Sequence, residues 1–207
     1  IMRRDAHVGT DGAYRIRSLY FDDLDDRCYY ENESGIEERD KYRIRIYNGD
    51  SRRITLEKKS KLRGMTLKSS CRITEEECRQ FMAGRLPLVE EDMPQTQKQL
   101  FGEMVQKCMR PVVIVEYVRY PFVEKNGNVR VTFDENISSS NDISKFLDEA
   151  LAFRPIMEKG QSILEIKWDE FLPGYLKQHM QVDSLSRSSF SKYYLCRKYN
   201  TYGGIRI

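Results

Sequence analysis

The sequence predicts an α+β fold in which an antiparallel β-barrel carries helices packed outside it, with residues 1–207 forming a single domain. The first observation is the strict alternation of residues 41–47, which puts Tyr42, Ile44 and Ile46 on one side of a strand and cations on the other. The second is the pair of hairpin signals at Asn48-Gly49 and Asn126-Gly127. Helical patterns are few and lie between the strands.

The first half of the chain is rich in strand patterns. Residues 1–13 are polar, contain glycine and read as a loop. After the strand at 14–21, residues 22–31 form either a turn or a short helix. Further strands are expected at 41–47, 53–59 and 65–73, joined by a hairpin turn at 48–51 and a basic turn at 60–64.

Helices enter in the second half. Thr74 and Glu77 have capping-box spacing and predict a helix start, and a second helical pattern covers 95–109. The later strands are expected at 112–119, 129–134 and 162–168. Residues 142–150 form a short helix at most, 169–180 are helical with an interruption at Pro173-Gly174, and 187–198 are a helix or irregular.

Composition narrows the class of protein. With 40% hydrophobic residues the chain can form a core, while a net charge of +3 is too small to indicate nucleic-acid binding. The five cysteines are odd in number and lack metal-site spacing, which is typical of reduced thiols in a cytoplasmic protein. No apolar run is long enough to span a membrane.

Charged residues alternate with bulky apolar residues in nearly every predicted strand. One arrangement places the apolar sides inward and leaves the charges in solvent. The other is a wide barrel whose lumen carries the charges and whose apolar sides are covered by helices. A lumen with many cations and few acids would bind a polyanion, because guanidinium groups match phosphate oxygens in pairs. A carboxylate there could share a divalent metal with phosphate.

Short motifs in a consistent order connect these strands to a known family. The motifs are Ser18-Leu19-Tyr20-Phe21-Asp22, Arg43-Ile44-Arg45, Leu56-Glu57-Lys58-Lys59, Glu116-Tyr117-Val118-Arg119, Val129-Arg130-Val131-Thr132-Phe133-Asp134, Leu164-Glu165-Ile166-Lys167 and Phe190-Ser191-Lys192-Tyr193. Together they resemble the VTC domain, the polyphosphate polymerase domain of the vacuolar transporter chaperone family and its bacterial relatives. That family lies in the triphosphate tunnel metalloenzyme superfamily, also described as CYTH-like.

The resemblance implies a tunnel with a basic lumen. It also implies ATP-dependent polyphosphate polymerase activity with Mn²⁺ or Mg²⁺ bound, so that ATP and inorganic polyphosphate are the expected partners. The residues implied as catalytic phosphate ligands are Arg43, Arg45, Lys59, Arg119 and Arg130. Those implied in substrate binding are Lys41, Glu57, Lys68, Tyr117, Lys167, Ser191 and Lys192, with Glu165 as the metal ligand. From the residues alone, Glu57 and Asp134 could instead order a neighbouring cation.

The sequence departs from the family pattern in two ways. The family's first strand carries a Glu-x-Lys element, and nothing in residues 1–13 matches it, so that strand is expected to be missing or upstream. Ser189 and Asn32 stand where relatives carry cations, for which Arg39 and Lys41 could compensate. Hydrolysis of a triphosphate, or binding of polyphosphate without catalysis, therefore stays open beside the polymerase.

Overall fold

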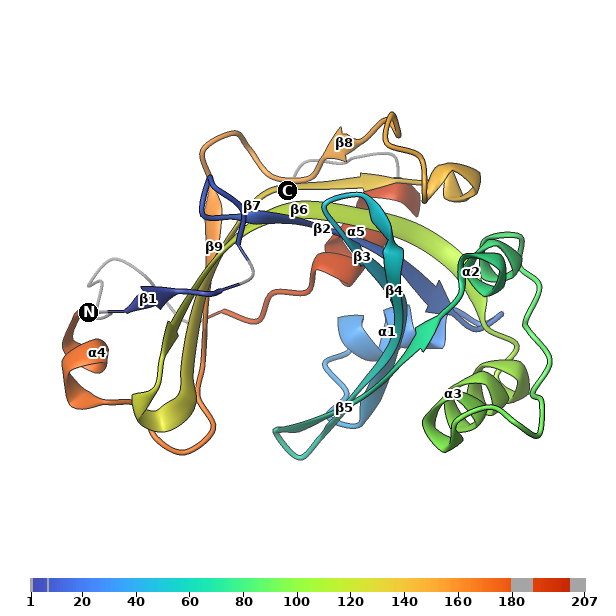
Figure 1. Cartoon of the computed structure of the whole chain (residues 1–207), viewed down its shortest axis with the longest axis horizontal. Helices are drawn as coiled ribbons and strands as arrows, with labels where there is room; N and C mark the ends of the chain where they lie inside the picture. The colour runs from blue at the N-terminus through green and yellow to red at the C-terminus, as the bar shows by residue number, and fades with distance from the viewer. Residues whose placement is uncertain (1, 7, 180–187, 202–207) are drawn as a thin grey trace.

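A curved antiparallel sheet dominates the computed structural model, which describes residues 2–6, 8–179 and 188–201 (Figure 1). Within these residues the sheet has nine strands in the order β5-β4-β3-β2-β6-β7-β8, with β1 paired to β6 and β9 paired to β7. The strands are β1 (Arg3–Arg4), β2 (Tyr14–Asp22), β3 (Arg39–Tyr47), β4 (Asp50–Leu62), β5 (Met65–Ile73), β6 (Arg110–Glu124), β7 (Val129–Ser140), β8 (Arg154–Pro155) and β9 (Ser162–Lys167).

The predicted α+β class with an antiparallel sheet is confirmed, but the sheet does not close into a barrel among the described residues. The sheet is antiparallel at every described pairing and bends into an arch, with β9 in one arm and β5 in the other (Figure 1). No pairing among the described residues joins β5 to β9, so the arch is open along these two edges. The helices are α1 (Arg27–Glu33), α2 (Glu75–Met82), α3 (Gln95–Gln106), α4 (Gly174–His179) and α5 (Lys192–Thr201), with 3₁₀ turns at Asn126–Asn128 and Ile143–Lys145.

Two predicted turns take the backbone geometry that their residues favour. Asn48 and Gly49 have φ angles of 53° and 72°, as a two-residue hairpin turn requires, and β3 continues into β4 through them. Gly127 has a φ of 73°, and a Cβ there would lie 2.0 Å from the carbonyl oxygen of Phe171. Only glycine fits that position, which brings the β6–β7 hairpin against the segment after β9.

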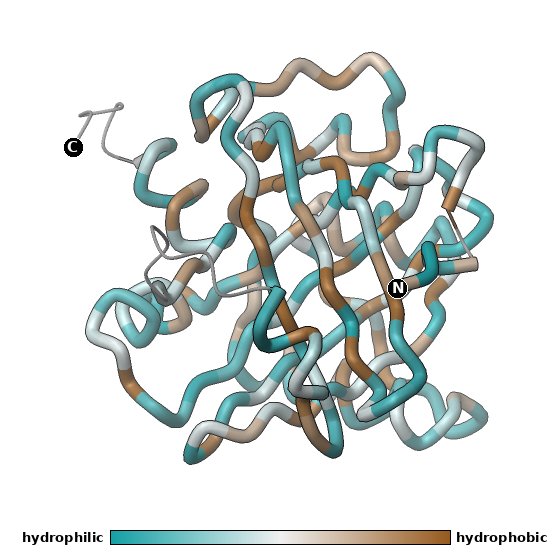
Figure 2. Tube along the Cα trace, turned by 90° about the vertical axis from the view of Figure 1, so that its left-hand side faces the viewer, coloured by the Kyte–Doolittle hydropathy of each residue, from teal (hydrophilic) through white to brown (hydrophobic). Residues whose placement is uncertain are grey.

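The main core lies on the convex side of the arch. The apolar faces of the strands pack there against α2 and α3, and the rings of Phe21, Phe81 and Phe101 meet edge to face. The predicted capping box is present: Thr74 accepts from the backbone of Glu77, whose carboxylate accepts from the backbone of Thr74. Figure 2 shows the corresponding alternation of hydrophobic and hydrophilic residues along neighbouring strands.

A smaller core secures the other arm. There α4 packs through Leu176 against Val129 and Val131 of β7. Two further helices, α1 and α5, lie on the concave side of the arch (Figure 1). The ring of Tyr193 in α5 packs 5.2 Å from that of Tyr20 in β2. The sequence did not predict this position for α5.

Several predicted boundaries were wrong in detail. Residues 1–13 contain the short strand β1, and the turn expected at 60–64 is confined to Arg63 and Gly64, because β4 extends to Leu62. The 3₁₀ turn at Ile143–Lys145 agrees with the short helix at most that was expected at 142–150. Residues 169–173 are not helical, and α4 begins at Gly174, where the interruption was expected. Residue 180 and residue 187 of the predicted C-terminal segments lie outside the described residues. No described helix has the length and apolarity needed to cross a membrane.

Candidate functional site

Cations line the concave face in rows that run across the strands. In the β3–β4 register Lys41 lies opposite Lys59 and Arg43 opposite Glu57, and in the β4–β5 register Lys59 lies opposite Lys68. Directly opposed residues share a face of the sheet, with Cβ atoms about 5 Å apart. The register therefore gathers charges from three strands on the side of the arch away from the main core.

Glu57 is the centre of a group that we call the β4 cluster, formed by Arg43, Arg45, Glu57 and Lys68. Its carboxylate lies 2.7 Å from Arg43 Nη2, 3.7 Å from Arg45 Nη1 and 2.5 Å from Lys68 Nζ. Burial alone would raise the pKa of Glu57, but the charges of Arg45, Arg43 and Lys68 outweigh it and lower the pKa to about 2. Glu57 is thus an anion that holds several cations in place.

Side chains from β2 fix the two arginines of this cluster. Arg43 Nη1 donates to the hydroxyl of Tyr20 at 3.2 Å, and Arg45 Nε donates to Ser18 Oγ at 3.4 Å. Burial would lower the pKa of Arg43, but Tyr20 and Glu57 raise it overall. Both guanidinium groups are therefore oriented by neighbouring side chains before any ligand binds.

A second group lies on the other arm, and we call it the β7 cluster: Arg119, Asp134, Glu165, Lys167 and Lys192. Arg119 binds both carboxylate oxygens of Asp134 at 2.7 Å, and Lys192 from α5 binds Asp134 at 2.7 Å. Asp134 is fully buried, and its pKa is lowered because these two cations outweigh the effect of burial. Glu165 lies 3.6 Å from Arg119 and 3.1 Å from Lys167.

Tyr117 connects the β7 cluster to α5. Lys192 Nζ lies 4.8 Å from the centre of its ring, and the guanidinium carbon of Arg119 lies 5.4 Å from it. Tyr117 is buried, so it presents its ring face to both cations. Tyr117 therefore lies beneath Arg119 and Lys192, two of the cations that the sequence analysis assigned to the site.

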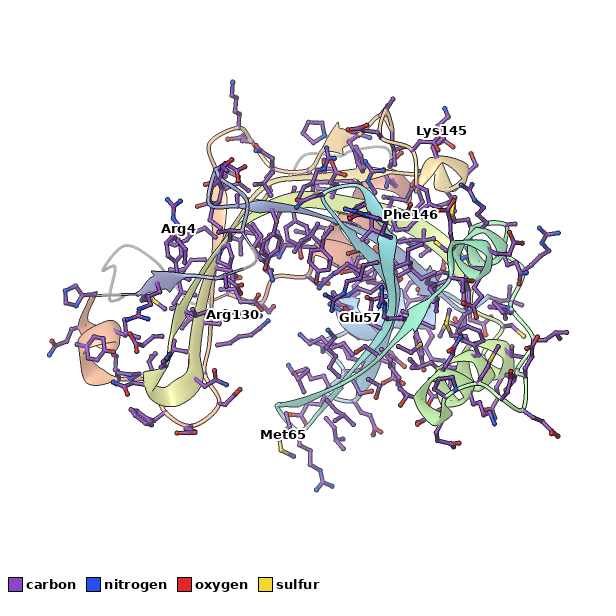
Figure 3. The ribbon with its side chains drawn as sticks, in the orientation of Figure 1. Arg4, Glu57, Met65, Arg130, Lys145 and Phe146 are labelled. Atoms are coloured by element: carbon purple, nitrogen blue, oxygen red, sulfur yellow. The ribbon has the colours of Figure 1, made fainter. Side chains whose placement is uncertain are left out.

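The two arms face one another across the arch. Figure 3 shows Glu57 on the β4 side and Arg130 on the β7 side. The pKa of Lys59 is lowered first by burial and then by the charge of Lys167, which belongs to the opposite arm. Arg130 lies apart from both clusters: its side chain is 53% exposed and pairs with Asp5 at 3.1 Å.

Lys41 joins the strands to both concave-side helices. Its ammonium donates to Asn32 Oδ1 of α1 at 2.7 Å and to Ser191 Oγ, just before α5, at 2.9 Å. Burial lowers the pKa of Lys41, and the neighbouring charges of Arg39 and Lys59 lower it further, to about 7. Lys41 is therefore a cation whose charge can change near neutral pH.

The donor set can be tested for a metal at Glu165. Among residues 2–6, 8–179 and 188–201, no group of three or more His, Cys, Asp and Glu side chains is placed to hold a metal ion by itself. Mg²⁺ and Mn²⁺ are, however, commonly held by one or two carboxylates together with substrate phosphates. Glu165 is 36% exposed on its side chain, and the buried hydroxyl of Thr132, directly opposite it on β7, has no hydrogen-bond partner in the part of the chain that the structure describes. These residues fit a metal completed by phosphate.

Most of the predicted site residues lie in the β4 cluster or in the β7 cluster. Two others, Lys41 and Ser191, are hydrogen-bonded to each other. Sequence reasoning missed the groups that position them, which are Ser18, Tyr20 and Asn32, and it also missed the buried hydroxyl of Thr132 opposite Glu165. In the β2–β3 register Ser18 lies opposite Arg45 and Tyr20 lies opposite Arg43, so both share a face with the arginines. Their two-residue spacing is a signal in the sequence, but only the register shows which residues they meet. Asn32, which binds Lys41 from helix α1, has no such signal in its spacing.

Further cations share the concave face. Arg39 lies opposite Lys61, and Thr55 lies between Arg45 and Arg72 in the register of β3, β4 and β5. Their alternation with apolar residues was visible in the sequence. The face is therefore more basic than the predicted site residues alone indicate.

The chain is similar to one family model and to solved structures of other proteins. The family model described as the VTC domain matches residues 2–200. A crystal structure from Bacillus halodurans, described as a putative adenylate cyclase, has a TM-score of 0.53 at 12% identity and covers 95% of this chain and 86% of that chain. The structure of PH1819 from Pyrococcus horikoshii OT3 has a TM-score of 0.37 at 15% identity, over 81% and 70% of the two chains. A search of curated proteins found no match.

The likeness to the Bacillus structure concerns the fold, because the identity is low. The family model, by contrast, spans nearly all of the described chain. The chain therefore belongs to the VTC domain family and has the triphosphate tunnel fold.

Proposed function

We propose that this chain, acting as one domain, transfers the γ-phosphate of ATP to a growing polyphosphate chain on its concave face. The observation that carries the proposal is the gathering of cations from both arms around three carboxylates, each of which is held by at least two cations. Phosphoryl transfer needs positioning and charge neutralisation more than covalent chemistry by the protein. A face of this kind supplies both.

The carboxylates in the two clusters suit a positioning role. Glu57 and Asp134 are almost fully buried, and their oxygens are directed at arginines and lysines. A phosphate that approaches the face meets oriented guanidinium groups and does not meet an exposed anion. We therefore assign Glu57 the ordering of Arg43, Arg45 and Lys68, with the cations contacting phosphate.

Glu165 is the carboxylate we assign to the metal. It is more exposed than Glu57 and Asp134, and it lies within reach of Lys167 and Arg119. Mn²⁺ or Mg²⁺ would neutralise developing charge on the transferred phosphoryl group. Arg119 and Lys167 would keep Glu165 ionised and turned toward the concave face, since its pKa is lowered by these cations against the effect of burial.

Polymer formation is favoured over hydrolysis by the extent of the basic face. It continues from Lys68 on β5 through both clusters to Lys167 on β9, and offers contacts to more phosphate groups than one triphosphate has. A triphosphate hydrolase is the second candidate. The position of α5 on the concave side favours it, because a helix there limits the passage of a long product (Figure 1).

Removal of single arginines tests whether the concave face binds phosphate. We expect Arg45→Ala to weaken polyphosphate binding by roughly tenfold or more, because the variant lacks one of the guanidinium groups of the β4 cluster to which we assign phosphate contacts. Arg130→Ala should have a smaller effect, because that side chain is half exposed and paired with Asp5. Titration calorimetry with long-chain polyphosphate measures both, and Arg85→Ala, an exposed position after α2, is the control. Unchanged affinity in both variants would refute phosphate binding on this face.

Lys41 gives the binding a pH signature. At pH 8 its ammonium is largely neutral in the free protein, because its pKa is lowered to about 7. A bound polyanion favours the charged form, so binding should take up a fraction of a proton at pH 8 and almost none at pH 6. Calorimetry in buffers of different ionisation enthalpy measures this uptake, and it should vanish in Lys41→Met. Equal uptake in the variant and the native protein would assign the proton to another group.

A further inference from the structure

A cavity of about 380 Å³ lies at the margin of the basic face, where β2 and β4 begin and β3 ends. Its volume is within the usual range for a small-molecule site, about 300–1,000 Å³. The residues that matter for its chemistry are Tyr14, Tyr47, Asn48, Asp50, Arg53 and Arg130. This mixture differs from the two clusters, because aromatic rings and a carboxylate stand beside the cations.

Two tyrosine rings form the apolar part of the cavity. Tyr14 and Tyr47 meet edge to face, with ring centres 5.7 Å apart and planes at 71°. Both side chains are partly buried. The pair packs against the core on one side and lines the cavity on its opposite side. Such rings offer a surface on which a planar base can stack, whereas phosphate gains little from them.

The cavity adjoins the arginines that the proposed function assigns to phosphate. The guanidinium carbon of Arg45 lies 6.0 Å from the ring centre of Tyr47. Tyr14 lies directly opposite Arg119 in the β2–β6 register. A ribose separates the base of a nucleotide from its first phosphate, so a base subsite must border the phosphate ligands, as this cavity does.

Polar groups on the rim complete the chemistry. The hairpin turn contributes Asn48 and Asp50, and β4 contributes the exposed Arg53. Asn48 is fixed, because its side-chain oxygen accepts the backbone N–H of Arg15 at 2.8 Å. Amide, carboxylate and guanidinium groups suit the edges of a base and the hydroxyls of a ribose.

We propose that this cavity is the nucleoside subsite, which binds the base and ribose of the nucleotide donor through the Tyr14–Tyr47 pair. The inference rests on the proposed function, because it takes a nucleoside triphosphate as the donor. It adds that discrimination between ATP and an inorganic triphosphate arises at these tyrosines, away from the phosphate ligands. The phosphates occupy the clusters in either case, and only the nucleoside reaches the cavity.

The test compares ATP with inorganic tripolyphosphate in the same calorimetric titration. We expect Tyr47→Leu to weaken ATP binding by about five- to tenfold, the usual effect of removing one stacking ring, and to leave tripolyphosphate affinity within about twofold. The unchanged tripolyphosphate affinity also reports that the variant is folded. Arg53→Ala, which removes an exposed side chain, should act in the same direction, and Arg85→Ala should change neither affinity.

Each other outcome overturns the inference in a recognisable way. If Tyr47→Leu weakens ATP and tripolyphosphate equally, the ring supports the phosphate ligands and the cavity is not a nucleoside subsite. If the native protein binds both ligands but neither Tyr47→Leu nor Arg53→Ala alters ATP affinity, the subsite is refuted while the proposed function stands. If the native protein binds neither ligand, the proposed function fails as well.

Discussion

Replacement of Glu165 by glutamine is expected to lower metal-dependent turnover at least about a hundredfold and to leave tripolyphosphate affinity within about twofold. The substitution keeps the size of the side chain and removes the negative charge that we assign to the metal. Phosphate binding should persist, because Arg119 and Lys167 lie beside Glu165 and keep their charge. Steady-state assays across Mn²⁺ concentrations and calorimetry with tripolyphosphate measure the two quantities separately.

Glu170→Gln is the matched control for this experiment. Glu170 lies in the exposed segment after β9, so its replacement should change neither the turnover nor the tripolyphosphate affinity. Full turnover in Glu165→Gln would show that the metal role is misassigned. A parallel loss of tripolyphosphate binding would show that Glu165 acts by holding Arg119 and Lys167.

Removal of Arg119 is expected to be the most destabilising single change on the concave face. Arg119 binds both oxygens of Asp134, which is fully buried, so Arg119→Ala leaves a buried carboxylate with Lys192 as its one remaining ion-pair partner among the described residues. Breaking such a pair costs about 3–5 kcal/mol of unfolding free energy. Urea denaturation followed by circular dichroism measures it.

Two variants make the interpretation of Arg119→Ala specific. Arg119→Ala combined with Asp134→Asn should recover part of the stability, because the unpaired charge is removed. Arg130→Ala, which breaks the half-exposed pair with Asp5, should cost about 1 kcal/mol or less. A loss as small in Arg119→Ala as in Arg130→Ala would contradict the account of the β7 cluster.

Local chemistry explains why much of the sheet could be predicted from sequence. The alternation around Arg43 and Arg45, the Asn48-Gly49 turn and the Thr74 cap depend on neighbours within a few residues, and the structure has all of them. The choice between an outward and an inward charged face could not be made by alternation alone. It required the helices, since α2 and α3 cover the apolar face and leave the other to the arch (Figure 1).

Long-range contacts explain what was not predicted. Helix α5 is held on the concave side by Tyr193, whose hydroxyl donates to the buried Asp22 more than a hundred residues earlier. Asp22 also accepts the backbone N–H groups of Cys28 and Tyr29, and so fixes the start of α1. The contact between Tyr193 and Asp22 has no sequence signal, because it joins segments far apart in the chain whose meeting is decided by the curvature of the whole sheet.

The same holds for the partners of the carboxylates. From the sequence, Glu57 could either contact the substrate or hold neighbouring cations in place, and the spacing of residues could not distinguish these two roles. The strand register places Arg43 and Lys68 on either side of it, on two different strands. Its environment is therefore a product of pairing between strands, and sequence alone specifies only the face on which it lies.

Incubation of the protein with ATP and Mn²⁺ is the most direct test of the central claim. Products are resolved on a gel stained for polyphosphate, while ADP and free phosphate are followed in the same reaction. The proposed polymerase predicts a ladder of polyphosphate with ADP released in step. Free phosphate without polymer, or no turnover by a protein that still binds polyphosphate, would contradict it.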